Sequence, residues 1–204
     1  PPQIILMTSI LQGAGKSTMA VNAAFSYLAD EESCLLIDVD LRKPSLHKIF
    51  QSSRQKKGLS SVLSGMAKLE EVITKTEYPG LDIITSGPLP PNPVELLSSA
   101  KMLDLLSLST ERFDYVVLDG PPVIGLADAL VIANLARGTL FVVDAGRTRF
   151  GAIEGAVKRL RAANANILGA VIDRLGRAGG GYGYGYSYDY HYTYSYGSRE
   201  EGRA

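Results

Sequence analysis

The sequence predicts a doubly wound α/β fold, with a mainly parallel sheet and helices on both faces. Short apolar runs alternate with segments of helical spacing along most of the 204 residues. A glycine-rich loop joins the first apolar run to the first helical segment, and acidic residues directly follow several of the runs. In a parallel sheet of this kind, the loops and acidic residues that follow the strands meet at one edge.

The expected strands are apolar runs without alternation, as is typical of strands that are buried on both faces. They are short, and each ends in a polar or acidic residue or a turn former. The runs are Ile4 to Met7, Cys34 to Ile37, Leu81 to Thr85, Tyr115 to Leu118, Leu140 to Val143 and Ile167 to Ile172.

The expected helices lie between these strands, where apolar residues recur every three or four positions. Prolines between positions 88 and 93 exclude regular structure there, so the helix that follows begins near Val94. The predicted helices are Lys16 to Ala29, Val94 to Leu108, Leu126 to Leu135 and Gly151 to Ala163, with short helices at Gly58 to Gly65 and Leu69 to Ile73.

Composition limits the choice of partner and compartment. Lys plus Arg and Asp plus Glu are both 21, so the net charge of zero gives no indication of a nucleic-acid partner. The only cysteine, Cys34, lies in an apolar run and is expected to be a buried strand residue in a reducing compartment.

No apolar stretch reaches the roughly 18 residues of a membrane span, which predicts a soluble chain. The first strand follows Pro1 so closely that residues upstream are expected to be missing.

The loop of residues 9–18 predicts a phosphate-binding site. Glycines allow backbone N–H groups to close around phosphate oxygens, Lys16 can reach the β- and γ-phosphates, and the Ser17 hydroxyl can hold Mg²⁺. The helix that opens at Lys16 adds the positive end of its dipole. The residues expected to contact the nucleotide are Gly13, Ala14, Gly15, Lys16, Ser17 and Thr18.

The loop departs from the full phosphate-loop pattern at one position, because Ile10 stands where that pattern has its first glycine. A turn that merely joins a strand to a helix is the structural alternative. A dinucleotide-binding fingerprint is excluded more firmly, since it requires glycine where this chain has Thr18.

Three carboxylates are expected at the same sheet edge as the loop. Asp38 and Asp40 follow the second strand, and Asp119 follows the strand at 115–118. With Ser17 they form a predicted Mg²⁺ site, because Mg²⁺ prefers oxygen ligands and keeps several waters. Asp38 or Asp40 could also accept the proton of a phosphate-accepting hydroxyl, and the sequence leaves open which of them does.

The composition changes sharply after Gly176, which predicts a domain of residues 1–176 and a C-terminal tail of residues 177–204. Tyrosines alternate with small or polar residues in the tail, and no aliphatic residue occurs among them. A strand with one aromatic face is possible, but the composition favours a flexible tail. The tyrosines are Tyr182, Tyr184, Tyr186, Tyr188, Tyr190, Tyr192, Tyr194 and Tyr196.

The ordered set of motifs resembles the bacterial tyrosine kinases of capsule and exopolysaccharide export, over essentially the whole chain. The motifs are GAGKST, LLIDVDLRKP, GLSSVLSG, SGPLPPNPVELL, DYVVLDGPP and the tyrosine-rich end. The resemblance implies a P-loop NTPase of the MinD/ParA-like type that uses ATP and Mg²⁺. It also implies that residues 13–18 are Walker A, that Asp38 and Asp40 belong to Walker A′, and that Asp119 is Walker B.

The resemblance implies a protein-tyrosine kinase that phosphorylates its own tail and acts in polysaccharide polymerisation and export. The expected partners are further copies of the chain in a homo-oligomer such as a ring, a transmembrane activator region of a polysaccharide co-polymerase, fused or separate, and a tyrosine phosphatase. The expected location is the cytoplasmic side of the bacterial inner membrane. The long reach of the tail predicts phosphorylation in trans, and added charge is expected to loosen the oligomer.

The chain departs from the family pattern in three places. Gln12 replaces a usual proline, which affects only loop stiffness. Asp173 stands where the family commonly has an asparagine that contacts the base, so Asp173 is a candidate contact. The oligomerisation motif that precedes the first strand in the family is absent.

Two other functions compete with a kinase. A partitioning or cell-division ATPase of the same fold would act as a nucleotide-dependent dimer switch, but such proteins carry a signature lysine where this chain has Leu11. A tail used only for adhesion would leave the phosphate loop without a role. The basic segment Arg42 to Lys57 is interpreted as a solvated face, with a subunit contact as the alternative.

Overall fold

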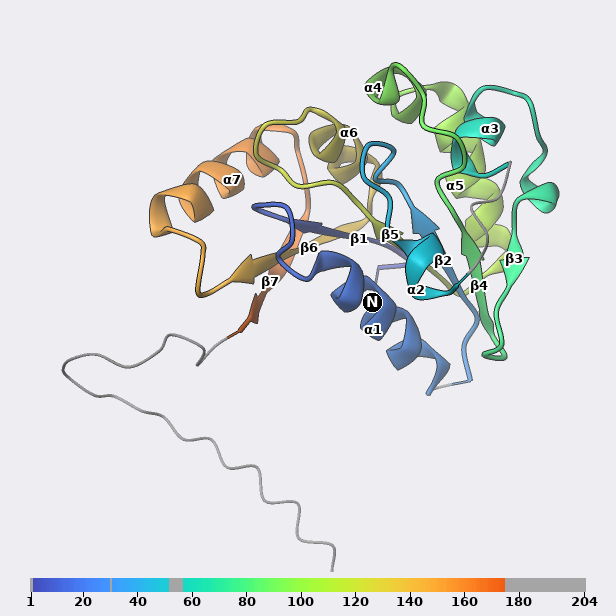
Figure 1. Ribbon diagram of the computed structural model, residues 1–204, viewed down its shortest axis with the longest axis horizontal. Helices are drawn as coiled ribbons and strands as arrows, with labels where there is room; N and C mark the ends of the chain where they lie inside the picture. Colours follow the sequence, from blue (N-terminus) through green and yellow to red (C-terminus); the bar gives the residue numbers. More distant parts are fainter. Residues whose placement is uncertain (1, 30, 52–56, 175–204) are drawn as a thin grey trace, which may run out of the picture.

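The computed structural model describes residues 2–29, 31–51 and 57–174. Its strands form one sheet in the order β3-β4-β2-β5-β1-β6-β7, in which every adjacent pair is parallel except β3 and β4 (Figure 1). The strands are β1 Ile4–Ser9, β2 Cys34–Asp38, β3 Thr74–Lys75, β4 Leu81–Ile84, β5 Tyr115–Asp119, β6 Gly138–Asp144 and β7 Ile167–Asp173.

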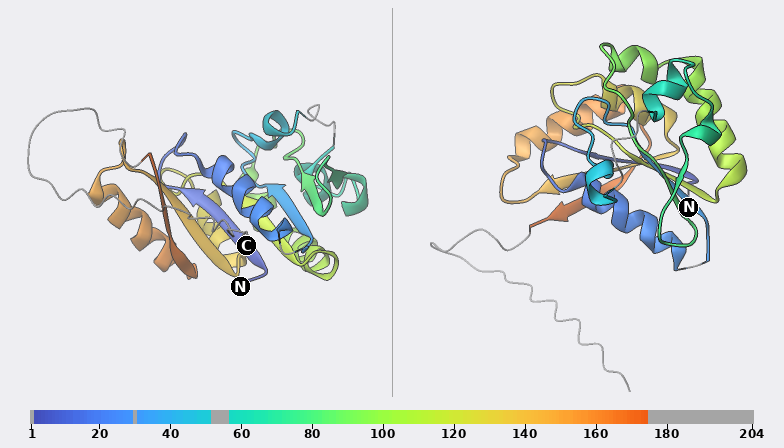
Figure 2. Two further views of the ribbon diagram at one scale, coloured as in Figure 1. Left: turned by 90° about the horizontal axis from the view of Figure 1, so that it is seen from below. Right: turned by 45° about the vertical axis from the view of Figure 1, so that its right-hand side comes forward.

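Helices cover both faces of the sheet, as predicted. In Figures 1 and 2, α5, α6 and α7 lie on one face and α1 lies on the other. The helices are α1 Lys16–Leu28, α2 Leu46–Ile49, α3 Leu59–Leu63, α4 Pro93–Leu97, α5 Ala100–Arg112, α6 Asp128–Leu135 and α7 Phe150–Ala162, with a 3₁₀ turn, η1, at Leu69–Glu71.

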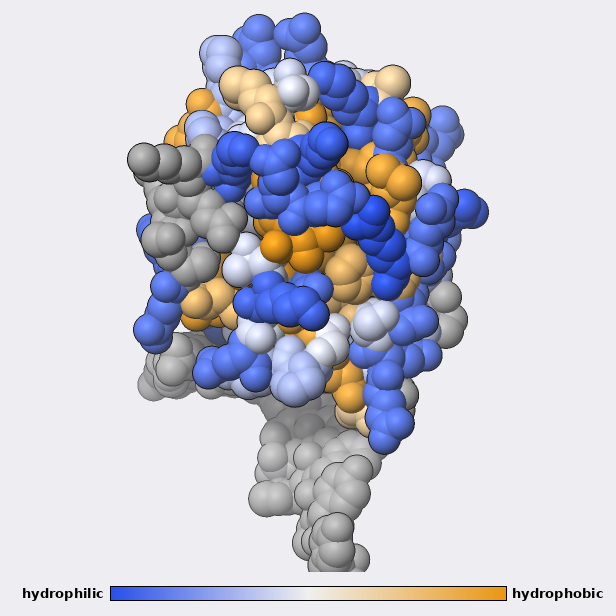
Figure 3. All heavy atoms as spheres, turned by 90° about the vertical axis from the view of Figure 1, so that its right-hand side faces the viewer, coloured by the Kyte–Doolittle hydropathy of each residue, from blue (hydrophilic) through white to orange (hydrophobic). Residues whose placement is uncertain are grey.

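The core is divided by the sheet into two layers. Successive residues of β5 point to opposite faces, so Val116 and Leu118 join the layer beneath α5–α7, whereas Val117 joins the layer beneath α1. Both layers are apolar, which explains the unbroken apolar runs of the central strands. The edge strand β7 is less covered, and its Leu168 and Ile172 are 45% and 58% exposed. On the side of β3 and α3, hydrophilic side chains surround smaller apolar patches (Figure 3).

The predicted single helix from Val94 to Leu108 is wrong, because two helices, α4 and α5, occupy this region. The break lies at Ser98 and Ser99, between the two helices. Ser99 has an extended backbone, with φ −73° and ψ 156°. Its hydroxyl donates to the carbonyl oxygen of Leu96 at 2.7 Å, so a side chain satisfies a backbone group that a continuous helix would have satisfied.

Two further elements differ from the sequence prediction. The expected helix from Leu69 to Ile73 is only the η1 turn, and the chain then forms β3, which pairs antiparallel with β4. The basic segment contains the short helix α2, which the sequence did not predict. Within the described ranges, no helix is long and apolar enough to cross a membrane.

Cys34 is a buried residue of β2, as predicted. Burial raises the pKa of its thiol to about 12. Because the folded pKa is raised, the neutral thiol favours the native state, and this contribution is lost as the pH rises from about 9 to about 12.

We therefore expect Cys34 to resist thiol reagents in the native protein. At pH 8 the thiolate fraction of a thiol with a pKa near 12 is roughly 1,000-fold lower than that of an ordinary cysteine. The test is the rate of labelling by a thiol-reactive dye, with the chain in concentrated urea as the control. Labelling of the native chain at the rate of the urea sample would contradict the burial of Cys34.

Candidate functional site

The glycine-rich loop connects β1 to α1 at the carboxyl edge of the sheet. Gly13 and Gly15 have φ of 78° and 84°, in the left-handed region that favours glycine. Gly15 immediately precedes α1, and within the described ranges no side chain caps the start of this helix. The backbone N–H groups of its first turn are therefore available to an anion, as the phosphate-loop interpretation requires.

Lys16 is buried and lies between two of the predicted carboxylates. Its Nζ is 3.2 Å from Asp40 Oδ2 and 3.5 Å from Asp119 Oδ1. Burial alone would lower the pKa of Lys16, but the attraction of Asp119 and Asp40 outweighs it and raises the pKa. Lys16 is therefore a cation at neutral pH and can neutralise the negative charge of a phosphate group.

Asp119 and two serines form the part of the site that could hold a metal ion. Ser45 Oγ lies 2.7 Å from Ser17 Oγ and 3.3 Å from Asp119 Oδ2. Asp119 is fully buried, and its Oδ1 accepts no hydrogen bond from the residues that the structure describes. Burial raises the pKa of Asp119, and the nearby Lys16 opposes this shift.

This set of oxygen atoms fits Mg²⁺. Asp119 Oδ1 is buried and accepts no hydrogen bond from the described residues, and the Ser45 hydroxyl donates to the other oxygen, Oδ2. Mg²⁺ takes a few protein oxygens together with phosphates and waters. The described residues contain no cluster of three or more His, Cys, Asp or Glu side chains that could hold a metal by themselves. The predicted metal ligands Ser17, Asp38, Asp40 and Asp119 stay a prediction.

Asp38 and Asp40 are in different surroundings, although only Val39 lies between them. Asp38 is fully buried, and its carboxylate accepts backbone N–H groups from Ser45 at 2.9 Å and Leu46 at 3.0 Å. Burial, together with the charge of Asp119, raises the pKa of Asp38 to about 7. Asp40 instead pairs with Lys16 and lines the pocket next to the loop.

This pocket has a volume of about 330 Å³ and contains most of the predicted nucleotide contacts. Its lining includes Gly13, Gly15, Lys16, Ser17, Thr18 and Asp40, whereas Ala14 is buried, with 2% of its surface exposed. Sequence reasoning missed Ser45 and Lys43, which also line the pocket. Lys43 donates to Gln12 Oε1 at 3.0 Å. Ser45 belongs to none of the quoted motifs, and Lys43 lies in the LLIDVDLRKP motif, for which the sequence predicted only the roles of Asp38 and Asp40.

Asp173 lies beside the phosphate loop, at the end of β7. A Cβ atom added to Gly15 would be 2.7 Å from Asp173 Oδ2. The next residue, Arg174, pairs with Asp144 and donates to the carbonyl oxygen of Gly13 at 3.4 Å. Asp173 is thus close to the nucleotide pocket, and its contact with a base stays a prediction.

The tail tyrosines 182–196 and the predicted domain boundary at 176 lie outside the described residues.

Gly15→Ala should destabilise the protein by about 2 kcal/mol, because a side chain would strain the left-handed backbone and meet Asp173. Gly125→Ala is the matched control. Gly125 has φ +89° but open space around it, so backbone strain alone should cost about 1 kcal/mol. Urea unfolding of both variants measures the difference. Equal losses of unfolding free energy in the two variants would show that the contact with Asp173 does not restrict position 15.

Comparison with known proteins places this site in a family. A family model described as an AAA domain matches residues 2–160. The tyrosine-protein kinase YwqD of Bacillus subtilis is 37% identical over 169 residues, which cover 83% of this chain and 71% of YwqD. The tyrosine-protein kinase ptk of Acinetobacter johnsonii is 38% identical over 168 residues, or 82% of this chain but only 23% of ptk.

Solved structures that are similar to this chain include a further tyrosine kinase. The kinase domain of the Escherichia coli tyrosine kinase ETK superposes with a TM-score of 0.82 at 34% identity, covering 90% of this chain and 72% of that domain. The septum site-determining protein MinD of Pyrococcus horikoshii, solved with Mg-ADP, has a TM-score of 0.73 at 22% identity and covers 86% of this chain and 72% of MinD. The likeness to MinD shows a shared fold alone.

The predicted P-loop NTPase fold of the MinD type is confirmed, and the fold together with the kinase relatives implies that a nucleotide binds with a divalent metal. The predicted enzyme class is also confirmed, because relatives at 37% and 38% identity over most of the chain are tyrosine-protein kinases. The chain belongs to the AAA domain family and, within it, to the bacterial protein-tyrosine kinases.

Proposed function

We propose that this kinase transfers the γ-phosphate of ATP to the tyrosines of its own C-terminal segment, residues 182–196, and that the segment of one copy is phosphorylated by another copy. The observation that carries the proposal is the buried Lys16 ammonium at the phosphate loop, held by Asp40 and Asp119. The segment offers eight tyrosines in the same chain as this site.

Each side chain of the site has a distinct role in the proposal. The N–H groups around Gly13 and Gly15 and the charge of Lys16 bind and orient the phosphates. Asp40 lines the pocket and accepts the phenol proton. Asp38 is buried and bound by the amides of Ser45 and Leu46, so it is a positioning residue that holds the start of α2.

Ser17 and Asp119 would hold Mg²⁺, with Ser45 hydrogen-bonded beside them. When bound, the ion neutralises phosphate charge as the phosphoryl group is transferred. Asp119 Oδ1 accepts no hydrogen bond from the described residues, and this buried oxygen next to the Lys16 ammonium supports the assignment.

The wider role follows from the family resemblance. We propose that the chain regulates the polymerisation and export of a capsule or exopolysaccharide at the cytoplasmic side of the bacterial inner membrane. Its partners would be a transmembrane region of a polysaccharide co-polymerase and a tyrosine phosphatase. The relative ptk supports the first partner, since this chain matches only 23% of its length and the kinase unit there is part of a longer protein.

The competing function is that of a nucleotide-dependent dimer switch, as in ATPases of the same fold. Leu11 stands at the position of their signature lysine and is packed against the core. This residue argues for the kinase, and the experiment that follows separates the two functions.

Lys16→Met should lower tail phosphorylation at least about 100-fold, because it removes the cation that faces the phosphates. The wild-type chain and the variant are incubated with Mg-ATP, and phosphotyrosine is mapped by mass spectrometry. Lys101→Met, an exposed lysine on α5, is the matched control and should retain activity. ATP hydrolysis without Lys16-dependent phosphotyrosine would favour the dimer switch.

Phosphorylation in trans is tested by mixing two chains. One is the Lys16→Met variant with an intact tail, and the other has a wild-type site but phenylalanine at all eight tail tyrosines. We expect phosphate on the tail of the Lys16→Met chain. A wild-type chain that phosphorylates itself, combined with no transfer in the mixture, would contradict the trans mechanism.

Full phosphorylation should dissociate the oligomer. Each phosphate adds about −1.5 to −2 charges, so eight sites add on the order of −12 to −16 to a chain of zero net charge. Static light scattering before and after incubation with Mg-ATP measures the mass of the assembly. An assembly of the same mass in both states would refute the proposed regulation.

A further inference from the structure

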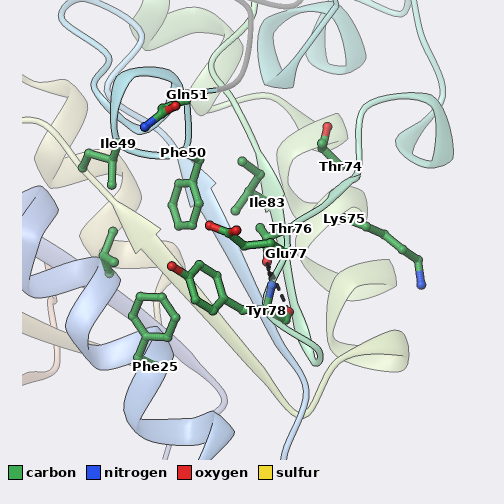
Figure 4. Close-up of a pocket in the computed structure, with 11 residues that line it drawn as sticks. Phe25, Ile49, Phe50, Gln51, Thr74, Lys75, Thr76, Glu77, Tyr78 and Ile83 are labelled. Carbon is green, nitrogen blue, oxygen red and sulfur yellow. Dashed lines mark hydrogen bonds between the residues drawn. The ribbon is translucent and has the colours of Figure 1, made fainter.

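A second pocket lies between α1, the end of α2 and the segment that connects β3 to β4 (Figure 4). Its volume is about 510 Å³, within the range of ligand-binding clefts. Three aromatic side chains, Phe25, Phe50 and Tyr78, form part of its wall, and polar residues of the segment 74–77 form another part. The rings of Phe25 and Tyr78 meet edge to face with their centroids 4.8 Å apart, and Phe50 faces them from the end of α2.

The wall of this pocket is accessible to a ligand. Tyr78 and Ile49 are 41% and 44% exposed, which is high for large apolar or aromatic residues next to a core layer. Phe25 and Phe50 pack against the apolar layer beneath α1 while remaining partly exposed. These side chains form a ready surface for another apolar or aromatic group.

Ile49 connects this pocket to the site of phosphoryl transfer. It lines the aromatic pocket on one side and the pocket of Lys16 and Asp40 on the other. A peptide that crosses Ile49 could therefore have one side chain among the aromatic residues and another near the nucleotide.

We propose that the aromatic pocket binds a tyrosine of the segment 182–196 of a second copy, while another tyrosine of the same segment reaches the phosphate site. The inference rests on the proposed kinase function and makes the pocket a docking site for the substrate. It assigns Phe50 and Tyr78 a role in substrate specificity.

The sequence of the segment fits this occupant. A tyrosine stands at every second position from Tyr182 to Tyr196, with mostly small residues between. In an extended peptide, side chains two positions apart lie about 6.6 Å apart on the same side. Wherever one tyrosine docks, others are presented at regular steps on either side, so a single docking site can serve many acceptors.

The charge at the pocket favours unphosphorylated tyrosine. Figure 4 shows the carboxylate of Glu77 directed to the Phe50 side of the pocket, whereas Lys75 points away from it. Phosphotyrosine carries about −1.5 to −2 charges and would be repelled by Glu77. Docking should therefore weaken as the segment becomes phosphorylated, which releases the product.

The binding experiment uses the full chain with serine at its eight tail tyrosines, so that its own tail does not compete. A fluorescent peptide of residues 182–196 is titrated, and its anisotropy gives the dissociation constant. We expect Phe50→Ala and Tyr78→Ser each to weaken binding about tenfold. Phe150→Ala, at a phenylalanine that is 74% exposed at the start of α7, is the matched control and should have no effect.

Kinetics test docking as part of the reaction, with the Lys16→Met chain as the tail substrate. Tyr78→Ser, at an exposed position where misfolding is not expected, should raise KM for this substrate about tenfold and leave kcat and the KM for ATP unchanged. An unchanged KM, or a fall in kcat alone, would overturn the inference. If no chain transfers phosphate but peptide binding still depends on Phe50 and Tyr78, the kinase proposal fails and the docking site stands.

Glu77→Gln tests the electrostatic part. The wild-type chain should bind the phosphorylated peptide at least about tenfold more weakly than the unphosphorylated one. In the variant the repulsion by Glu77 is removed, so the ratio of the two dissociation constants should fall, and only the larger size of phosphotyrosine should still weaken binding. An equal preference in the wild type and the variant would overturn the role of Glu77 in product release.

Discussion

The structure depends on how three buried carboxylates are accommodated at one edge of the sheet. Asp38 and Asp119 are neighbours in the register of β2 and β5, and both are fully buried. Unpaired charges in such a position would be very unfavourable. Lys16 compensates by lying between Asp40 and Asp119, and the amides at the start of α2 satisfy Asp38. The same groups that make this edge stable also form the nucleotide pocket.

This arrangement explains why the parallel sheet is needed for function. In the strand order β2-β5-β1, Asp38, Asp119 and the phosphate loop come together although they are spread over about a hundred residues of the sequence. Because all three strands run in the same direction, their carboxyl ends meet at one point. A bound nucleotide would add further negative charge there, which the Lys16 cation can offset.

Most of the sheet and part of the site could be predicted from the sequence. Central strands such as β5 are buried on both faces, so their apolar runs are visible locally, and the phosphate loop has a local pattern of glycines. β3 could not be predicted, because Thr74 and Lys75 are partly exposed and become a strand only by pairing with β4. Ser45 has no local signal either, since its contacts with Ser17 and Asp119 arise from the tertiary fold.

The short helix α2, which the sequence did not predict, connects the nucleotide site to the aromatic pocket. At its start, the amides of Ser45 and Leu46 bind the buried carboxylate of Asp38, which fixes the helix against the nucleotide site. At its end, Ile49 and Phe50 form part of the aromatic pocket. The helix is four residues long, so its end cannot move far without disturbing its start. The hydrogen bonds that Asp38 accepts from Ser45 and Leu46 therefore position not only the phosphate pocket but also the wall on which a substrate tyrosine would rest.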